Sequence, residues 1–145
     1  MKSKVYFSDL KTSLSKNLPQ KIKMLLDTAE LKNIINPDGL VAVKLHFGEK
    51  GNTAFIRPHF IRDIVDCIYE CGGKPFLTDA NTLYRGERTE AVSHITIALR
   101  HGFNATTVSA PVIIADGLKG NDAVTVGVKG KHFSEAFLAS AIDQA

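Results

Sequence analysis

Apolar residues recur along the chain at two alternating spacings, one typical of helices and the other of strands. Spacings of three and four positions predict helices that start near residues 15, 58 and 89. Short apolar runs have the length of strands, and they lie at residues 5–7, 40–45, 74–78 and 112–115. This alternation predicts an α/β fold, a three-layer sandwich built on a mostly parallel sheet.

Several local signals sharpen these elements. Asn17 is a candidate cap for the first helix, Pro58 suits the start of the second, and Thr89 can cap the third. The run at residues 40–45 does not alternate, which favours a strand buried on both faces. The third helix is expected to bury Val92, Ile95, Ala98 and Leu99.

The last part of the chain predicts an antiparallel hairpin at a sheet edge. Alternating valines at residues 124–128 precede Lys129-Gly130, and a second strand is expected at 131–133. Residues 134–142 predict a short helix, although residues 133–142 also have strand character. The chain has 145 residues and no internal repeat or linker, so residues 1–145 are expected to form a single domain.

Composition and charge narrow the function classes. The net charge is +3, and no run of basic residues gathers on one face, which argues against a nucleic-acid partner. No apolar run approaches the roughly 20 residues of a membrane span. The N-terminus lacks the apolar region of a signal peptide, so we expect a cytoplasmic protein without membrane association.

The two cysteines, Cys67 and Cys71, lie four positions apart in the second predicted helix. They have no third or fourth ligand of the kind that zinc or an iron–sulfur cluster needs. They are therefore expected to be buried, inert thiols, and no cofactor is identifiable from the residues of this chain.

Polar residues follow three of the predicted strands, at residues 44–57, 79–88 and 116–117. Ligands of open α/β sheets bind beyond the carboxyl ends of the strands, so these loops are expected to form one site. The candidate ligand-binding residues are Lys44, His46, Gly48, Asn52, Thr53, Arg57, Asp79, Asn81, Thr82, Tyr84, Arg85, Asp116 and Gly117.

Lys44 and His46 are the first candidates along the chain. Lys44 lies in an apolar run, where a buried ammonium needs a partner such as Asp79 or a ligand anion; a purely structural ion pair is the alternative. His46 can act as a general acid or base, or bind a metal ion together with Asp79. Alternatively, it forms only a hydrogen bond to the backbone.

The loops offer further groups for an anion. Gly48 permits close approach of a ligand, and Arg57 with the amides at the start of the second helix is a candidate anion site; a solvated loop is the alternative. Asn81 can contribute to a metal site or merely cap its loop. Arg85 and Arg88 add bidentate donors.

The remaining histidines carry no companion pattern. His59, His101 and His132 are expected at the surface, whereas His94 adjoins the inner stripe of its helix. No arrangement typical of covalent catalysis is evident, so catalytic residues stay unassigned. The sequence predicts binding of a small anionic or metal-associated molecule.

Three segments together resemble the domain of unknown function 362 family, whose members are often labelled uncharacterised iron–sulfur center proteins. They are residues 43–49 (VKLHFGE), 78–86 (TDANTLYRG) and 115–117 (ADG). The resemblance implies that longer members continue into a ferredoxin-like segment with [4Fe–4S] clusters, so this chain is expected to correspond to their N-terminal part. An alternative function follows: a non-enzymatic companion module of an iron–sulfur electron-transfer protein. An absent next strand would also leave a sheet edge open for a homodimer.

Overall fold

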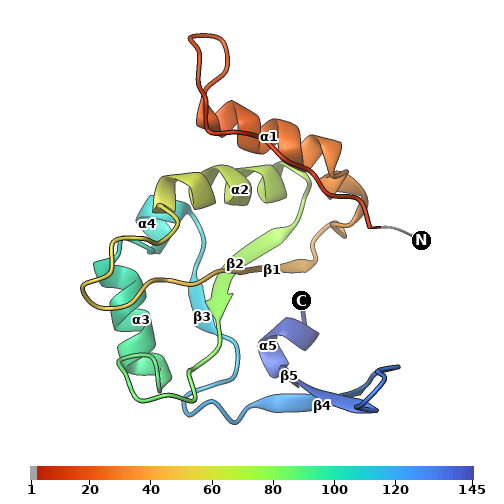
Figure 1. Cartoon of the computed structure of the whole chain (residues 1–145), viewed down its shortest axis with the longest axis vertical. Coiled ribbons are helices and arrows are strands. Elements are labelled where there is room, and N and C mark those ends of the chain that lie inside the picture. The colour runs from red at the N-terminus through yellow and green to blue at the C-terminus, as the bar shows by residue number, and fades with distance from the viewer. Residues whose placement is uncertain (1–2) are drawn as a thin grey trace.

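The structure is a computed structural model that describes residues 3–145. Three parallel strands form the central sheet in the order β1-β2-β3 (Figure 1), namely β1 (Leu40–Lys44), β2 (Lys74–Asp79) and β3 (Val112–Ile114). The antiparallel strands β4 (Ala123–Gly127) and β5 (Glu135–Ala139) pair as a separate hairpin. The α/β class, the parallel sheet and the antiparallel hairpin are therefore confirmed.

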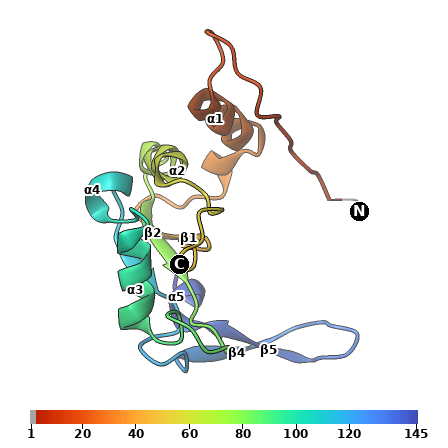
Figure 2. The same ribbon diagram turned by 60° about the vertical axis from the view of Figure 1, so that its left-hand side comes forward.

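Helices lie on both sides of this sheet. They are α1 (Leu18–Thr28), α2 (Pro58–Glu70), α3 (Ala91–Arg100), α4 (Ala105–Val108) and α5 (Ser140–Asp143), with a 3₁₀ turn at Leu31–Asn33. α3 and α4 lie on one side of the sheet and α5 on the other (Figures 1 and 2). The order β1-β2-β3 with right-handed crossovers places α2 and α3 on the same side. Among residues 3–145, no helix combines the length and apolarity needed to cross a membrane.

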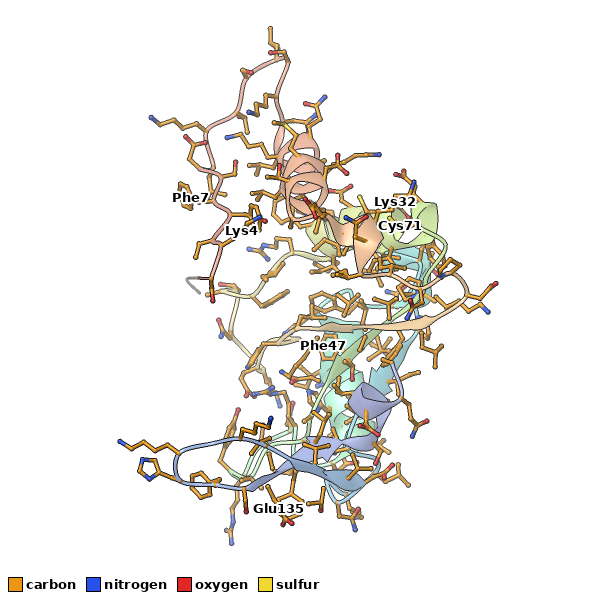
Figure 3. The ribbon with its side chains drawn as sticks, turned by 90° about the vertical axis from the view of Figure 1, so that its right-hand side faces the viewer. Lys4, Phe7, Lys32, Phe47, Cys71 and Glu135 are labelled. Atoms are coloured by element: carbon orange, nitrogen blue, oxygen red, sulfur yellow. The ribbon has the colours of Figure 1, made fainter. Side chains whose placement is uncertain are left out.

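The main core lies between the sheet and helices α2 to α4. Its central side chain is Phe47, which is fully buried, packs edge-on against Phe103 and lies in the middle of the molecule (Figure 3). The other buried members are Leu45, Ile61, Val65, Leu77, Ala91, Ala98, Val108, Ala110 and Ile114. This packing brings the carboxyl ends of the strands close to the start of α3.

Two predicted helices begin as the sequence indicates, and the third differs. Asn17 caps α1 in a capping box with Gln20, and Pro58 is the first residue of α2. The cap of α3 is Glu90, whose carboxylate accepts from two backbone N–H groups, and not Thr89. The predicted inner stripe of α3 is only partly right: Ala98 is buried and Ile95 packs against the core, but Val92 and Leu99 are exposed. Ala91, His94 and Ile97 are buried in their place.

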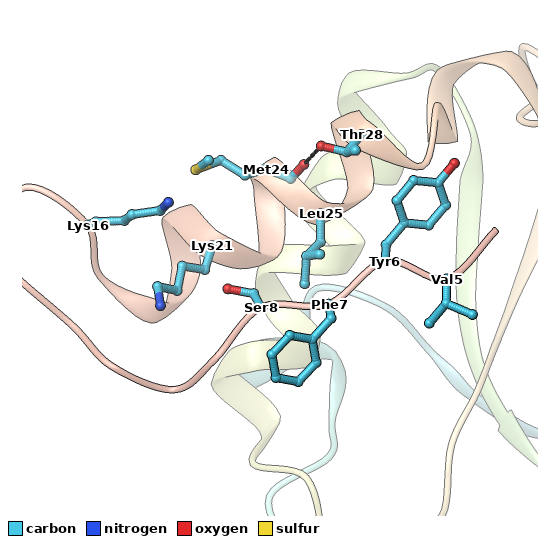
Figure 4. A pocket seen from close by; sticks show the side chains of 9 residues that line it. All are labelled: Val5, Tyr6, Phe7, Ser8, Lys16, Lys21, Met24, Leu25 and Thr28. Atoms are coloured by element: carbon cyan, nitrogen blue, oxygen red, sulfur yellow. Dashed lines mark hydrogen bonds between the residues drawn. The ribbon is translucent and has the colours of Figure 1, made fainter.

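The N-terminal strand prediction was wrong. Residues 5–7 form no strand, and the Val5 and Phe7 side chains are 88% and 85% exposed. The segment runs beside α1, where it lines a groove of about 300 Å³ with Met24 and Leu25 (Figure 4). No neighbouring strand is in reach to accept its backbone hydrogen bonds in the described part of the chain.

The strand at residues 40–45 and the hairpin also required correction. β1 is an edge strand whose central residues are only half-buried, so it is not buried on both faces. The second hairpin strand is β5, not residues 131–133, and the final helix shrinks to α5; the strand character of residues 133–142 accounts for the difference. The hairpin does not extend the parallel sheet but is linked to it by the Ala141 N–H, which donates to Ala115 O at 3.2 Å.

Candidate functional site

Lys44 and Asp79, the last residues of β1 and β2, form an ion pair at the carboxyl edge of the sheet. Lys44 Nζ lies 3.0 Å from Asp79 Oδ1, so the predicted partnership is confirmed. The expected burial of the ammonium is wrong, because the Lys44 side chain is 62% exposed. Lys44 ends an edge strand, and its flexible stem carries the charge to water.

Arg88 joins the two predicted loops. Its side chain is only 4% exposed, and Nη1 donates to Asp79 Oδ2 at 3.0 Å while Nε donates to Glu49 Oε1 at 2.8 Å. Nη2 also donates to the Tyr84 hydroxyl, which itself donates to Glu49 at 2.6 Å. A buried guanidinium is stable only with such partners, so Arg88 fixes the loops to one another.

His94 approaches the same carboxylate from α3. Its ring is fully buried, with Nε2 3.6 Å from Asp79 Oδ2 and its centroid 5.9 Å from that of Phe47. This distance exceeds a hydrogen bond, and neither ring nitrogen has a hydrogen-bond partner among the described residues. His94 therefore belongs to the site by position, which its helical spacing alone did not reveal.

The electrostatics of the cluster favour ionised carboxylates. Burial raises the pKa of the Asp79 carboxyl. The His94 ring, the Lys44 ammonium and the Ala80 N–H outweigh this effect and hold the pKa of Asp79 at about 2. Hydrogen bonds from Tyr84 and Arg88 likewise lower the pKa of Glu49. At neutral pH the positive charges of Lys44 and Arg88 balance the negative charges of Asp79 and Glu49. Of the two cations, only Lys44 is exposed.

Asp116 and Gly117 form the third wall of the site, as the strand order predicted. Both Asp116 carboxylate oxygens accept from the Asn81 N–H, at 3.0 and 2.9 Å, and Asn81 Nδ2 donates to Gly117 O at 2.9 Å. The Thr82 N–H donates to Arg88 O at 2.8 Å, which continues the connection to the first cluster. Asn81 thus connects its loop to Asp116 and Gly117 and does not cap its own loop, because Oδ1 has no partner among the described residues.

His46 and Gly48 have local partners. His46 is exposed, and its Nδ1 accepts from the Gly48 N–H at 2.9 Å, which is the backbone-bonded alternative. Gly48 has φ 95°, and a Cβ at this position would lie 2.5 Å from His101 Nδ1. His101 was expected at the surface, but its half-buried ring bonds Phe47 O at 2.7 Å and stacks on Phe55. The glycine therefore serves close packing against His101.

Four more of the predicted residues, like His46 and Gly48, have no polar link to the Lys44–Asp79 pair in the described part of the chain. They are Asn52, Thr53, Arg57 and Arg85, and all are exposed. Asn52 Oδ1 accepts from the Ala54 N–H at 2.7 Å, and the Arg57 guanidinium lies over the Phe55 ring at 5.5 Å. The second half of the loop at 44–57 thus packs toward Phe55 and His101.

Metal ligands are not assembled at this site. Within residues 3–145, no three His, Cys, Asp or Glu side chains are grouped to hold a metal ion. Cys67 lies on α2 and Cys71 is its C-cap; both are half-buried, not buried as expected. Burial raises the pKa of the Cys67 thiol. The candidate site therefore offers the exposed Lys44 ammonium as a hydrogen-bond donor, held in place by the buried Asp79–Arg88–Glu49 cluster.

A comparison with known protein families gives one match, and it covers the segments that form this candidate site. Residues 41–145 match the model of the domain of unknown function DUF362, and this match includes β1 from its second residue on, both polar loops and the Asp116-Gly117 wall. No curated protein and no solved structure gives a significant match. Because the match extends over most of the chain, the protein belongs to the DUF362 family.

Proposed function

We propose that this protein binds a small anionic molecule at the carboxyl edge of its sheet, with Lys44 as the principal contact. The observation that carries the proposal is the exposed Lys44 ammonium, which Asp79 holds by one hydrogen bond. An ammonium has three donors, so Lys44 keeps donors free for a ligand. Asp79 is itself fixed by Arg88, so the cation is held in place before any ligand arrives.

The surrounding loops support an anion more than a metal ion. Both Asp79 oxygens already accept hydrogen bonds, Oδ1 from Lys44 and Oδ2 from Arg88, and Glu49 Oε1 accepts from Arg88, so these oxygens are less available to a cation. His46 and Arg85 are exposed on the same two loops and offer further donors. Arg85 in particular suits carboxylate or phosphate oxygens, which a guanidinium binds in a bidentate manner.

Calorimetric titration with citrate and with inorganic pyrophosphate tests the proposal. The informative variant is Lys44→Gln, and the matched control is Lys74→Gln, which removes an equally exposed lysine at the opposite end of β2. Since a hydrogen bond to a charged group contributes about 1.5–3 kcal/mol, Lys44→Gln should weaken binding about tenfold or more.

Lys74→Gln should bind the same anions as the wild type does. Both variants lose one positive charge, so a general attraction to the positively charged protein would weaken equally in both. Equal affinities of the two variants would contradict the proposal, and so would a wild type that binds neither anion.

A further inference from the structure

β1 leaves one edge of the parallel sheet without a partner strand in the part of the chain that the structure describes. The Lys74 N–H donates to Gly39 O at 2.8 Å, and the Leu45 N–H donates to Thr78 O at 3.0 Å. These bonds turn Gly39 and Leu45 toward β2. Because backbone direction alternates along a strand, the N–H and C=O groups of Leu40, Ala42 and Lys44 point away from β2.

A groove of about 470 Å³ runs beside this edge. Its apolar lining includes Leu31, Ile34, Ile35, Leu40, Ala42 and Ile142. Leu40 is 53% exposed, and the outward-facing positions of β1 carry no charge before Lys44 and no proline. Edges of monomeric sheets are normally protected by charges, proline or bulges, so an unprotected apolar edge favours strand pairing with another chain.

We propose that the β1 edge pairs antiparallel with the same edge of a second copy, so that two sheets become one. A two-fold axis at Ala42 satisfies both copies at once, because each outward-facing group meets its equivalent. In this register Ala42 pairs with the partner's Ala42, and Leu40 pairs with the partner's Lys44. The N–H and C=O groups of Leu40, Ala42 and Lys44, which point away from β2, then form hydrogen bonds with the second copy.

Charge complementarity at both ends supports this register. The Asp38 side chain is 88% exposed, lies two residues before Leu40 and pairs with Lys74 of its own chain at 3.1 Å. With φ 61°, Asp38 belongs to the turn before β1 and not to the strand. Across the axis this turn lies beyond the partner's Leu40, so it adds negative charge on the side of Lys44. Because an ammonium has three donors, the bond to Asp79 and a contact with the partner's Asp38 leave one donor for a ligand.

The oligomeric state tests the interface, through a pair of matched variants. Light scattering after size-exclusion chromatography should give a dimer for the wild type at micromolar concentration. Leu40→Lys places a charge in the interface and should give a monomer. Leu83→Lys changes an exposed leucine in the loop after β2 and should remain a dimer.

Ala42→Pro provides a second variant that keeps the fold. Proline at this position removes an N–H that faces away from β2, so it spares the β1–β2 hydrogen bonds while blocking the edge. Ala42→Pro should be a monomer with the far-ultraviolet circular dichroism of the wild type.

Amide exchange identifies the strand that pairs. The Ala42 and Lys44 amides should be protected in the wild type and should exchange at least tenfold faster in Leu40→Lys. A monomeric wild type would overturn the proposal, and so would a Leu40→Lys dimer. A monomer with protected Ala42 would show that a segment of the same chain covers the edge, which also overturns it. These measurements need no anion, so their failure leaves the Lys44 site untouched.

Discussion

Replacing Asp79 by asparagine is the most direct perturbation of the buried cluster. The Asp79 carboxylate is buried, accepts from Lys44, Arg88 and the Ala80 N–H, and lies next to the His94 ring. Asparagine keeps the shape of the side chain and removes its charge. The Arg88 guanidinium then loses one of its two carboxylates, which destabilises the folded protein.

The pKa of Asp79 gives the magnitude. The folded value of about 2 lies below the ordinary value of 3.8. This lowering of the Asp79 pKa corresponds to about 2 kcal/mol of stability. Because the folded pKa is the lower one, the carboxylate stabilises the fold fully above about pH 5, and this contribution is lost as the pH falls toward 2.

Urea unfolding followed by circular dichroism, at pH values from 7 to 2.5, measures this effect. The gap in unfolding free energy between wild type and Asp79→Asn should shrink by roughly 1–2 kcal/mol as the pH falls over this range, because most but not all of the contribution is lost by pH 2.5. The control is Asp66→Asn, which breaks an exposed i,i+4 ion pair with Arg62 and should cost under about 0.5 kcal/mol at pH 7. A gap for Asp79→Asn that stays constant down to pH 2.5 would refute the reasoning.

Two further substitutions probe the loops through their stability in urea. Arg88→Met removes the buried guanidinium and should lower the free energy of unfolding by about 3 kcal/mol. Arg85→Met changes an exposed side chain and should lower it by less than about 0.5 kcal/mol. Equal losses would show that Arg88 does not stabilise the loops more than an exposed arginine does. Gly48→Ala combines φ 95° with a clash against His101 and should cost about 3 kcal/mol. Gly51 has φ 80° but open space around it, so Gly51→Ala should lower the free energy of unfolding by only about 1 kcal/mol. Similar losses for the two variants would show that the contact with His101 does not matter.

The location of the site was predictable from the order of strands and loops. Parallel strands bring their carboxyl ends to one edge, so Lys44, Asp79 and Asp116 could be expected together before their contacts were known. The structure confirms the Lys44–Asp79 pair, which required no knowledge of side-chain packing because each residue ends a strand. The contacts between Asn81 and Asp116 were not predicted individually.

The interior of the cluster was not predictable in the same way. Arg88 and Arg85 lie in one charged loop, and spacing does not tell which of them turns inward. The apolar face of α3 is wide and lies opposite Ser93, Thr96 and Arg100, so the spacing left open which part of that face is buried and did not reveal that His94 is buried. Glu49 became significant only through its distance to Arg88, a long-range contact that no local pattern records.

Strand environment was the other failure of local reasoning. The apolar run at residues 40–45 is typical of a central strand, yet its position in the sheet order leaves one edge without a partner strand among residues 3–145. Burial of a strand depends on what packs beside it, and hydrophobicity alone does not specify a neighbour. The same reasoning explains the N-terminal segment at residues 5–7, which has strand composition without a strand partner.

The central claim is that an anion binds beside Lys44 on the base formed by Asp79 and Arg88. Titration of citrate into the isotope-labelled wild type, followed by amide chemical shifts at constant pH and salt, tests it most directly. If citrate binds beside Lys44, the largest changes in amide chemical shift fall at residues 44–49 and 79–85. Shifts concentrated instead at the lysines of the hairpin tip, Lys129 and Lys131, would contradict it.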